Sequence, residues 1–241
     1  DGWRSNYVQD LTAEEGHPIR NFGTGNKETL AGDNRSALLD FYKKYYIASN
    51  MKLAMLSNQS LAEQSALVRN YFGGIPDRPF TLPVIDPDYR KPLKDKYRLL
   101  KIKAIKDIRS LSVEFPTIFL KDHQESKPAT IVSTLLGHEG KGSLLSKLKE
   151  EGLVLSLSAG GGYSHPNINA FSVTVSLTQK GLREYQRVLE LLFAYIQMIR
   201  DEGIRKYTYD EESMMSEIDF KWKDPEEGAG FVSGRSALMH D

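Results

Sequence analysis

The chain has 241 residues with 32 basic and 32 acidic side chains, so its formal net charge is zero, and 40% of the residues are hydrophobic. This composition can fill a hydrophobic core, which excludes an intrinsically disordered chain. The balanced charge gives no electrostatic footprint for nucleic acid or an anionic membrane surface. Cysteine is absent, which excludes disulfide scaffolds, thiol nucleophiles and cysteine-ligated metal sites.

No membrane span is predicted, because no stretch approaches the roughly 18 continuous apolar residues that a membrane helix needs. The first residues do not resemble a signal peptide, and neither end has the composition of a tail or linker. We therefore expect the chain to be a piece of a longer protein. Both the periplasm and the cytoplasm remain open as its compartment.

The first third of the chain predicts two helices. The first thirty residues are expected to be irregular, and apolar residues then recur every three or four positions over 35–46, with residue 33 or 34 as the N-cap. A short strand is predicted over 51–57. The second helix begins at the capping-box sequence 60–63 and ends at Gly73, where glycine can take the left-handed conformation.

A proline-rich segment follows and predicts a domain boundary near Leu82. Five of the ten prolines lie between residues 75 and 92. They are Pro76, Pro79, Pro83, Pro87 and Pro92. Such a segment can neither continue a helix nor lie inside a sheet.

The pattern after this linker predicts strands over 97–103 and 111–115 and helices over 128–136 and 144–152. Lys101, Lys103, Lys106 and Arg109 are interpreted as solvated residues that protect a sheet edge from unwanted pairing.

A hairpin is predicted next, with strands over 153–157 and 171–177 joined by a loop over 159–167. Each strand alternates between apolar and hydroxyl side chains, as in an antiparallel sheet that is covered on one face. Thr178 then caps a long helix, and a last helix begins at a capping box formed by Thr208 and Glu211. The predicted fold class is α+β, with antiparallel sheets and helices packed on one face.

Catalytic motifs are absent from the sequence. The five histidines are His17, His123, His138, His165 and His240. None is spaced from another as in a zinc-binding helix, so we interpret them as solvent-facing loop residues. The glycine cluster 137–142 does not match a phosphate loop and is favoured as a tight turn between two helices. The glycines after Ala159 allow two interpretations, a hairpin loop or a strand end whose backbone stays open to a peptide strand.

Several segments together resemble the insulinase/pitrilysin family of zinc metallopeptidases. The resemblance rests on segments 1–4, 17–18, 21–27, 41–46, 105–111, 115–116, 136–145, 148–149, 175–178 and 181–182. The most specific of these are Phe-Gly-Thr-Gly-Asn-Lys at 22–27 and Gly-His-Glu-Gly-Lys-Gly-Ser-Leu-Leu at 137–145.

The resemblance implies that the chain holds parts of two consecutive domains of a clamshell enzyme. Residues 1–82 would be the C-terminal part of the catalytic domain and 83–241 most of the second domain. The zinc ligands of the family lie before residue 1, so zinc is expected in the parent enzyme and none on this fragment, which should be inactive alone. The implied partners are peptide substrates and the remaining domains of the same polypeptide.

The family also has a peptide-anchoring exosite in its second domain. Carried over by position, its residues are Gly137, His138, Glu139, Leu157, Ser158, Ala159 and Gly160. The sequence departs from the family at Ser158 and Ala159, where close relatives carry Val-Gly. An alternative is that the parent is a catalytically inactive family member that acts as a structural or interaction subunit.

Overall fold

A computed structural model describes residues 1–240 except 82, 86–97, 119, 124 and 166–167. The chain divides into two units. The first unit comprises Asp1–Asn21 and Ile85–Lys221, and the second comprises Phe22–Val84 and Trp222–Asp241. The predicted boundary near Leu82 lies outside the described residues.

The first unit is built on an antiparallel sheet of β1 (Ser110–Pro116), β2 (Val154–His165) and β3 (Ile168–Leu177). The strand order is β1-β3-β2, so β3 is central and pairs with a strand on both sides. Val173 of β3, for example, lies opposite Val113 of β1 and Ala159 of β2.

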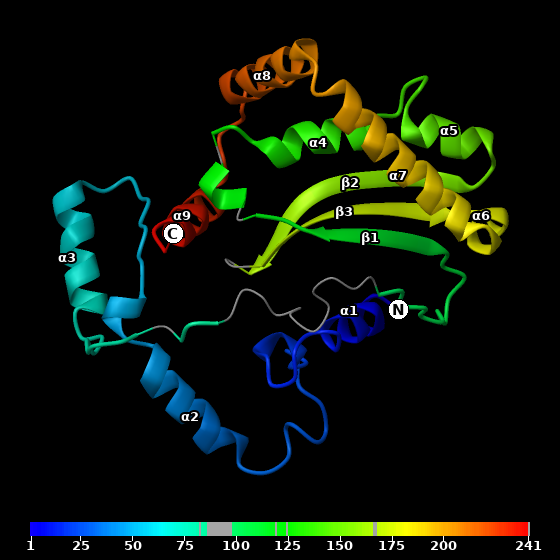
Figure 1. Cartoon of the computed structure of the whole chain (residues 1–241). Coiled ribbons are helices and arrows are strands. Elements are labelled where there is room, and N and C mark those ends of the chain that lie inside the picture. The colour runs from blue at the N-terminus through cyan, green and yellow to red at the C-terminus, as the bar shows by residue number, and fades with distance from the viewer. Residues whose placement is uncertain (82, 86–97, 119, 124, 166–167, 241) are drawn as a thin grey trace. The chain divides into compact units, whose positions relative to one another are not determined.

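Helices cover one face of this sheet, as predicted (Figure 1). They are α4 (Pro128–Gly137), α5 (Leu144–Glu150) and α7 (Tyr185–Glu202). Their apolar sides and the inward side chains of the strands form one core. Leu148 and Leu153 are fully buried, and each such side chain contributes about 1.5–3 kcal/mol relative to an exposed one. The α+β fold class is therefore confirmed.

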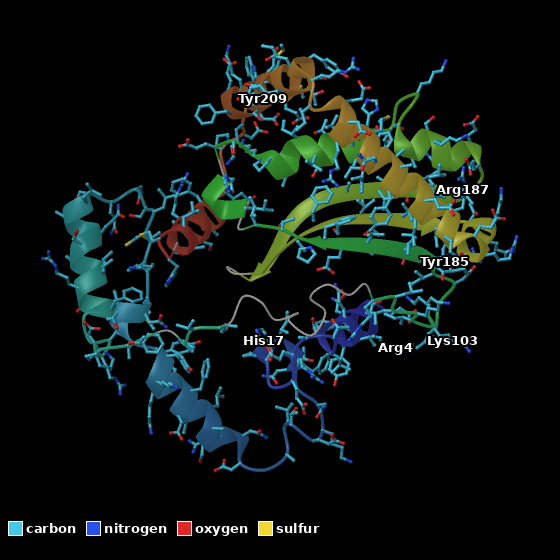
Figure 2. All side chains as sticks on the ribbon, in the orientation of Figure 1. Arg4, His17, Lys103, Tyr185, Arg187 and Tyr209 are labelled. Atoms are coloured by element: carbon cyan, nitrogen blue, oxygen red, sulfur yellow. The ribbon has the colours of Figure 1, made fainter. Side chains whose placement is uncertain are left out.

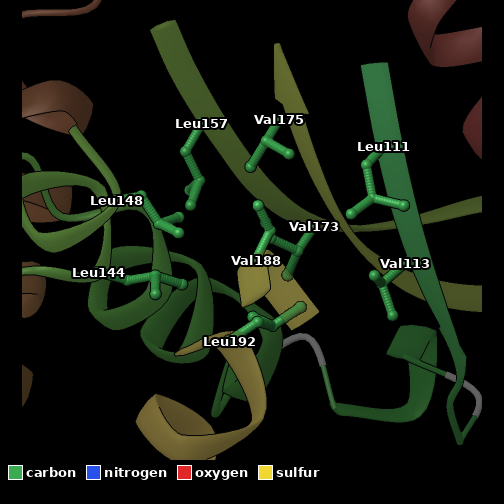
Figure 3. A pocket seen from close by; sticks show the side chains of 9 residues that line it. All are labelled: Leu111, Val113, Leu144, Leu148, Leu157, Val173, Val175, Val188 and Leu192. Carbon is green, nitrogen blue, oxygen red and sulfur yellow. The ribbon is translucent and has the colours of Figure 1, made fainter. Parts of the chain in front are cut away.

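The middle of this core contains a small cavity lined only by apolar side chains (Figure 3). Its lining comes from the sheet and from α5 and α7. A cavity without polar partners for water is typical of imperfect packing in a core. We therefore assign it no ligand.

The opposite face of the sheet carries hydroxyl side chains. Ser112, Thr174 and Ser158 lie side by side across the three strands, and the Ser112 and Thr174 oxygens are 2.8 Å apart. The predicted alternation between an apolar and a hydroxyl face is thus confirmed.

The predicted hairpin loop over 159–167 is wrong for its described part. Ala159–His165 continues β2, and Gly160 and Gly161 lie opposite Ser172 and Phe171 of β3. Glycine has low strand propensity, but pairing along a neighbouring strand outweighs this preference. Residues 166–167 lie outside the described part.

The other helices of the first unit are α1 (Gly2–Asp10), η1 (Pro18–Arg20), η4 (Leu120–His123), α6 (Gln179–Arg183) and α8 (Lys206–Lys221). The expectation of an irregular N-terminus was wrong at α1. Thr178 caps a helix as predicted, but this helix is α6, which is separated from α7 at Glu184 (φ −106°, ψ 32°). Thr208 lies inside α8 and is 5% exposed, so its role is packing and the predicted capping box is wrong.

Two predicted strands are absent from the described residues. The segments 51–57 and 98–103 form no strand, and Tyr97 lies outside the described part. A short apolar run is not enough to form a strand when no partner edge is available to it.

The second unit contains α2 (Asn34–Tyr45), η2 (Ala48–Asn50), α3 (Leu61–Phe72) and α9 (Gly228–Leu238), of which α9 was not predicted. Asp33 caps α2, and both hydrogen bonds of the Ser60–Glu63 capping box are present. Gly73 ends α3 with a φ of −63°, so the predicted left-handed cap is wrong. Of the described helices in both units, none is long and apolar enough to cross a membrane.

Candidate functional site

The candidate site consists of the turn between α4 and α5 and the edge strand β2, all within the first unit. His138 directly follows α4, and its Nδ1 accepts a hydrogen bond from the Gly140 N–H at 3.1 Å. A Cβ atom on Gly140 would lie 2.5 Å from His138 Cε1. The imidazole therefore occupies the space that the missing side chain leaves, and Nε2 is the nitrogen that can donate from a neutral ring.

The second half of the turn is fixed by Gly142 and Ser143. Gly142 has a φ of +83°, a conformation that strongly favours glycine. Ser143 is 2% exposed, and its Oγ accepts from the Ser146 N–H at 3.1 Å to cap α5. Glu139 is exposed at the apex. The prediction of a tight interhelical turn is confirmed, and the turn presents one carboxylate and one imidazole to solvent.

The strand β2 lies at an edge of the sheet. It pairs with β3 on one side, and among the described residues no strand pairs with its other side. Leu157 points into the core and is 8% exposed, whereas Ser158 is exposed. Unpaired backbone N–H and C=O groups on such an edge can template an additional strand.

Helix α4 connects these two parts of the candidate site. Near its N-terminus, Ala129 Cβ lies 2.8 Å from the position of a Cβ on Gly161. One turn later, Ser133 Oγ lies 4.0 Å from the corresponding position on Gly160. The helix therefore runs antiparallel to β2, as Figure 1 shows, so its C-terminal end at Gly137 points toward the start of the strand.

An ion-pair cluster holds the connection from α5 to β2. Glu151 accepts two hydrogen bonds from Arg187 of α7, both of 3.0 Å, and Lys147 Nζ lies 3.4 Å from the Glu151 carboxylate. Figure 2 labels Arg187 on the molecule. The hydrogen bonds from Arg187 lower the pKa of Glu151 to about 2, and Glu151 in turn raises the pKa of Arg187. Lys180 Nζ donates to the Glu151 carbonyl at 2.8 Å. These contacts fix the point at which the chain enters β2.

The basic residues that were predicted to protect a sheet edge make some contacts. Lys101 Nζ lies 5.5 Å from the centre of the Tyr185 ring, and Arg109 pairs with Asp107 at 2.6 Å. Lys101, Lys103 and Lys106 are exposed, which agrees with a solvated role.

Histidine positions only partly match the expectation of solvent-facing loop residues. His123, His138 and His240 are exposed. His17 is 9% exposed, and its Nδ1 accepts the Ile19 N–H at 3.1 Å, so burial and capping of η1 account for it.

Zinc requires about four ligands in tetrahedral arrangement, of which at least three usually come from protein side chains. In the described part of the chain, no group of three His, Asp or Glu side chains is arranged to hold a metal ion. The described residues of this chain therefore do not fit a catalytic zinc ion.

A protein-family model described as "Peptidase M16 inactive domain" matches residues 34–214. The chain belongs to the M16 peptidase family. This is the insulinase/pitrilysin family that the sequence resembles. The M16 match spans about three quarters of the chain, including α4, the turn and β2.

Curated M16 relatives cover the chain almost completely. Insulin-degrading enzyme of Drosophila melanogaster is 35% identical, over 99% of this chain and 25% of that protein. The human insulin-degrading enzyme is 34% identical, over 100% of this chain and 24% of that protein. The A-factor-processing enzyme of Saccharomyces cerevisiae is 33% identical, over 99% of this chain and 24% of that protein. The chain thus spans about a quarter of the length of these relatives.

Solved structures give the same fold. Pitrilysin matches with a TM-score of 0.77 and 28% identity, over 99% of this chain and 26% of that chain. A structure described as the peptidase M16 inactive domain from Pseudomonas fluorescens matches with a TM-score of 0.66 over 98% of this chain and 54% of that chain. Its identity is 16%, so it supports the fold alone.

Sequence reasoning missed two features of this M16 site, the close approach of Ala129 to Gly161 and the Glu151–Arg187 pair. For the approach of Ala129 to Gly161, the sequence offered one signal: the run of glycines after Ala159 is longer than a turn needs. The second joins residues 36 positions apart, and no local pattern points to such a pair.

Proposed function

We propose that this chain is part of a zinc-dependent endopeptidase and contributes scaffold and a peptide-anchoring exosite. The exosite would comprise Gly137, His138 and Glu139 of the turn and Leu157–Gly160 of β2. The observation that supports the proposal is the edge position of β2, together with the antiparallel course of α4, the helix that leads into the turn. A bound peptide would add as a further strand, held by backbone hydrogen bonds and therefore tolerant of sequence.

The catalytic chemistry of the whole enzyme would come from outside these 241 residues. In such enzymes zinc lowers the pKa of a bound water and polarises the scissile carbonyl. The described residues of this chain do not fit a zinc ion, so we propose that the chain alone cleaves no peptide. Its partners would be peptide substrates and the remaining domains of the same polypeptide, with residues 1–82 in one insulinase-like domain and 83–241 in the next.

A second candidate is a catalytically inactive family member that acts as an interaction subunit. The matching family model is described as an inactive domain, and a segment without catalytic groups fits this candidate as well as the first. The two candidates differ in the full-length protein, where an inverted His-x-x-Glu-His helix and zinc-dependent cleavage would identify an active parent.

Photo-crosslinking tests the exosite directly. The probe is a decapeptide of alternating Val and Thr with a benzophenone side chain at its N-terminal residue. We expect adducts within 137–139 and 157–160 after mass spectrometry of the irradiated complex. Adducts confined to other segments would contradict the exosite, and zinc-dependent cleavage of this peptide by the purified chain would contradict its inactivity.

A further inference from the structure

The two glycines at the end of the exosite strand have different surroundings. A Cβ on Gly160 would find its nearest neighbour, Ser133 Oγ, at 4.0 Å, which is an ordinary contact. A Cβ on Gly161 would lie 2.8 Å from Ala129 Cβ and 3.0 Å from Leu120 Cδ1. Carbon atoms in contact are normally about 3.5–4.0 Å apart. An alanine thus fits at 160 but requires a shift of about 1 Å at 161.

Helix α4 is attached on its other sides by polar contacts. Thr134 Oγ1 donates to Glu212 of α8 at 2.7 Å, and Tyr195 of α7 donates to the Leu135 carbonyl at 3.4 Å. Ile131 and Leu136 are buried. With its later part anchored in this way, α4 can accommodate a displacement at Ala129 only by tilting or shifting as a whole, and the end of the helix leads into the exosite turn.

We propose that Gly161 is a positioning residue for peptide anchoring. Its missing side chain admits Ala129 and sets how closely α4 approaches β2, and this approach sets where Gly137 and His138 stand relative to the open strand edge. The inference rests on the proposed exosite, but the part that concerns helix position does not need a bound peptide.

The test compares Gly161→Ala with Gly160→Ala as its matched control. We expect Gly161→Ala to weaken binding of the Val-Thr decapeptide about tenfold or more, equivalent to ~1.4 kcal/mol, and to shift the free-state amide signals of Gly137–Gly140. Gly160→Ala should leave those free-state signals in place, because its Cβ makes only an ordinary contact. Gly230→Ala, in α9 and outside the proposed exosite, should bind within about twofold of the parent. The double variant Ala129→Gly/Gly161→Ala removes the closest contact, leaves the movable end of the Leu120 side chain at 3.0 Å, and should recover both readouts.

Three results would overturn the inference. They are unchanged amide signals at Gly137–Gly140 in Gly161→Ala, an equal displacement of those signals in Gly160→Ala, and a double variant as weak as Gly161→Ala. If Gly161→Ala alone does not fold, the double variant decides the question. It can recover folding and peptide binding only if the contact with Ala129 caused the loss. A parent chain that does not bind the peptide would refute the exosite, while the free-state amide shifts would still decide the positioning role.

Discussion

The two ends of β2 differ in how their polar groups are satisfied. At its start, Leu153 donates to the Leu148 carbonyl, its own carbonyl accepts from Thr178, and the preceding turn is clamped by Glu151 and Arg187. At the other end, the strand pairs only with β3 among the described residues. The contacts that anchor β2 to the rest of the fold are therefore concentrated at the start of the strand, whereas its outer edge leaves backbone groups available to a further strand.

We expect the largest loss of stability for a substitution in the core next to the start of β2. Leu148 is 0% exposed and lines the small core cavity, so Leu148→Ala enlarges an existing void. We expect a loss of about 2–5 kcal/mol in the free energy of unfolding, measured by urea denaturation. Leu155, on β2 but 63% exposed, is the control, and Leu155→Ala should cost less than about 0.5 kcal/mol. Similar losses for both variants would contradict the packing described for this end.

Gly181→Ala is expected to rank next. A Cβ at this position would lie 1.9 Å from the Leu153 carbonyl oxygen, a backbone atom that cannot move without displacing the start of β2. We expect a loss of about 3 kcal/mol in the free energy of unfolding. Gly234→Ala in α9 is the control, because its Cβ would meet nothing within 4 Å, and replacing a helical glycine is stabilising. A Gly181→Ala protein as stable as the parent would contradict the close approach.

The Glu151–Arg187 pair predicts a pH dependence. Hydrogen bonds from Arg187 lower the pKa of Glu151 from 4.5 to about 2. A carboxylate whose pKa is lowered by folding stabilises the fold fully at pH values above its ordinary pKa of 4.5. This stabilisation is lost as the pH falls from about 4.5 toward 2.

Unfolding measurements at several pH values check this. The stability difference between the parent and Glu151→Gln should be constant above pH 5 and disappear near pH 2. Glu190→Gln removes the more exposed partner of Arg187 and should leave the shape of the pH profile unchanged. A parent-minus-Glu151→Gln difference that does not vary with pH would contradict the pair.

The smallest effect is expected at the open end. Ser158 is exposed on the hydroxyl face, and a peptide held by backbone groups does not need its side chain. Ser158→Val should change the free energy of unfolding by less than about 0.5 kcal/mol and peptide affinity by less than about twofold. A loss of about tenfold or more would show that the side chain, not the backbone, anchors the peptide.

Local patterns predicted those parts of the fold that local physics controls. The Ser60–Glu63 capping box, Pro128 at the start of α4 and the alternation of β3 were all confirmed. Strand predictions failed where pairing with a distant segment decides whether a strand forms. Residues 51–57 lack a partner strand in the described part, whereas the glycine-rich end of β2 found one in β3.

The candidate site was only half visible from sequence. The turn at Gly137–Gly142 followed from its glycines, and the role of the edge strand came from family resemblance. The approach of Ala129 to Gly161 depends on how α4 packs over the sheet, and this packing arises from the whole core and not from either segment.

Amide NMR titration shows whether a peptide adds to the open edge of β2. With the Val-Thr decapeptide, we expect saturable shifts at Leu157–Gly160 and at Gly137–Glu139. The same peptide with every amide N-methylated has no N–H to donate and should cause none of them. Equal binding of both peptides, or shifts that leave Leu157–Gly160 untouched, would contradict the account.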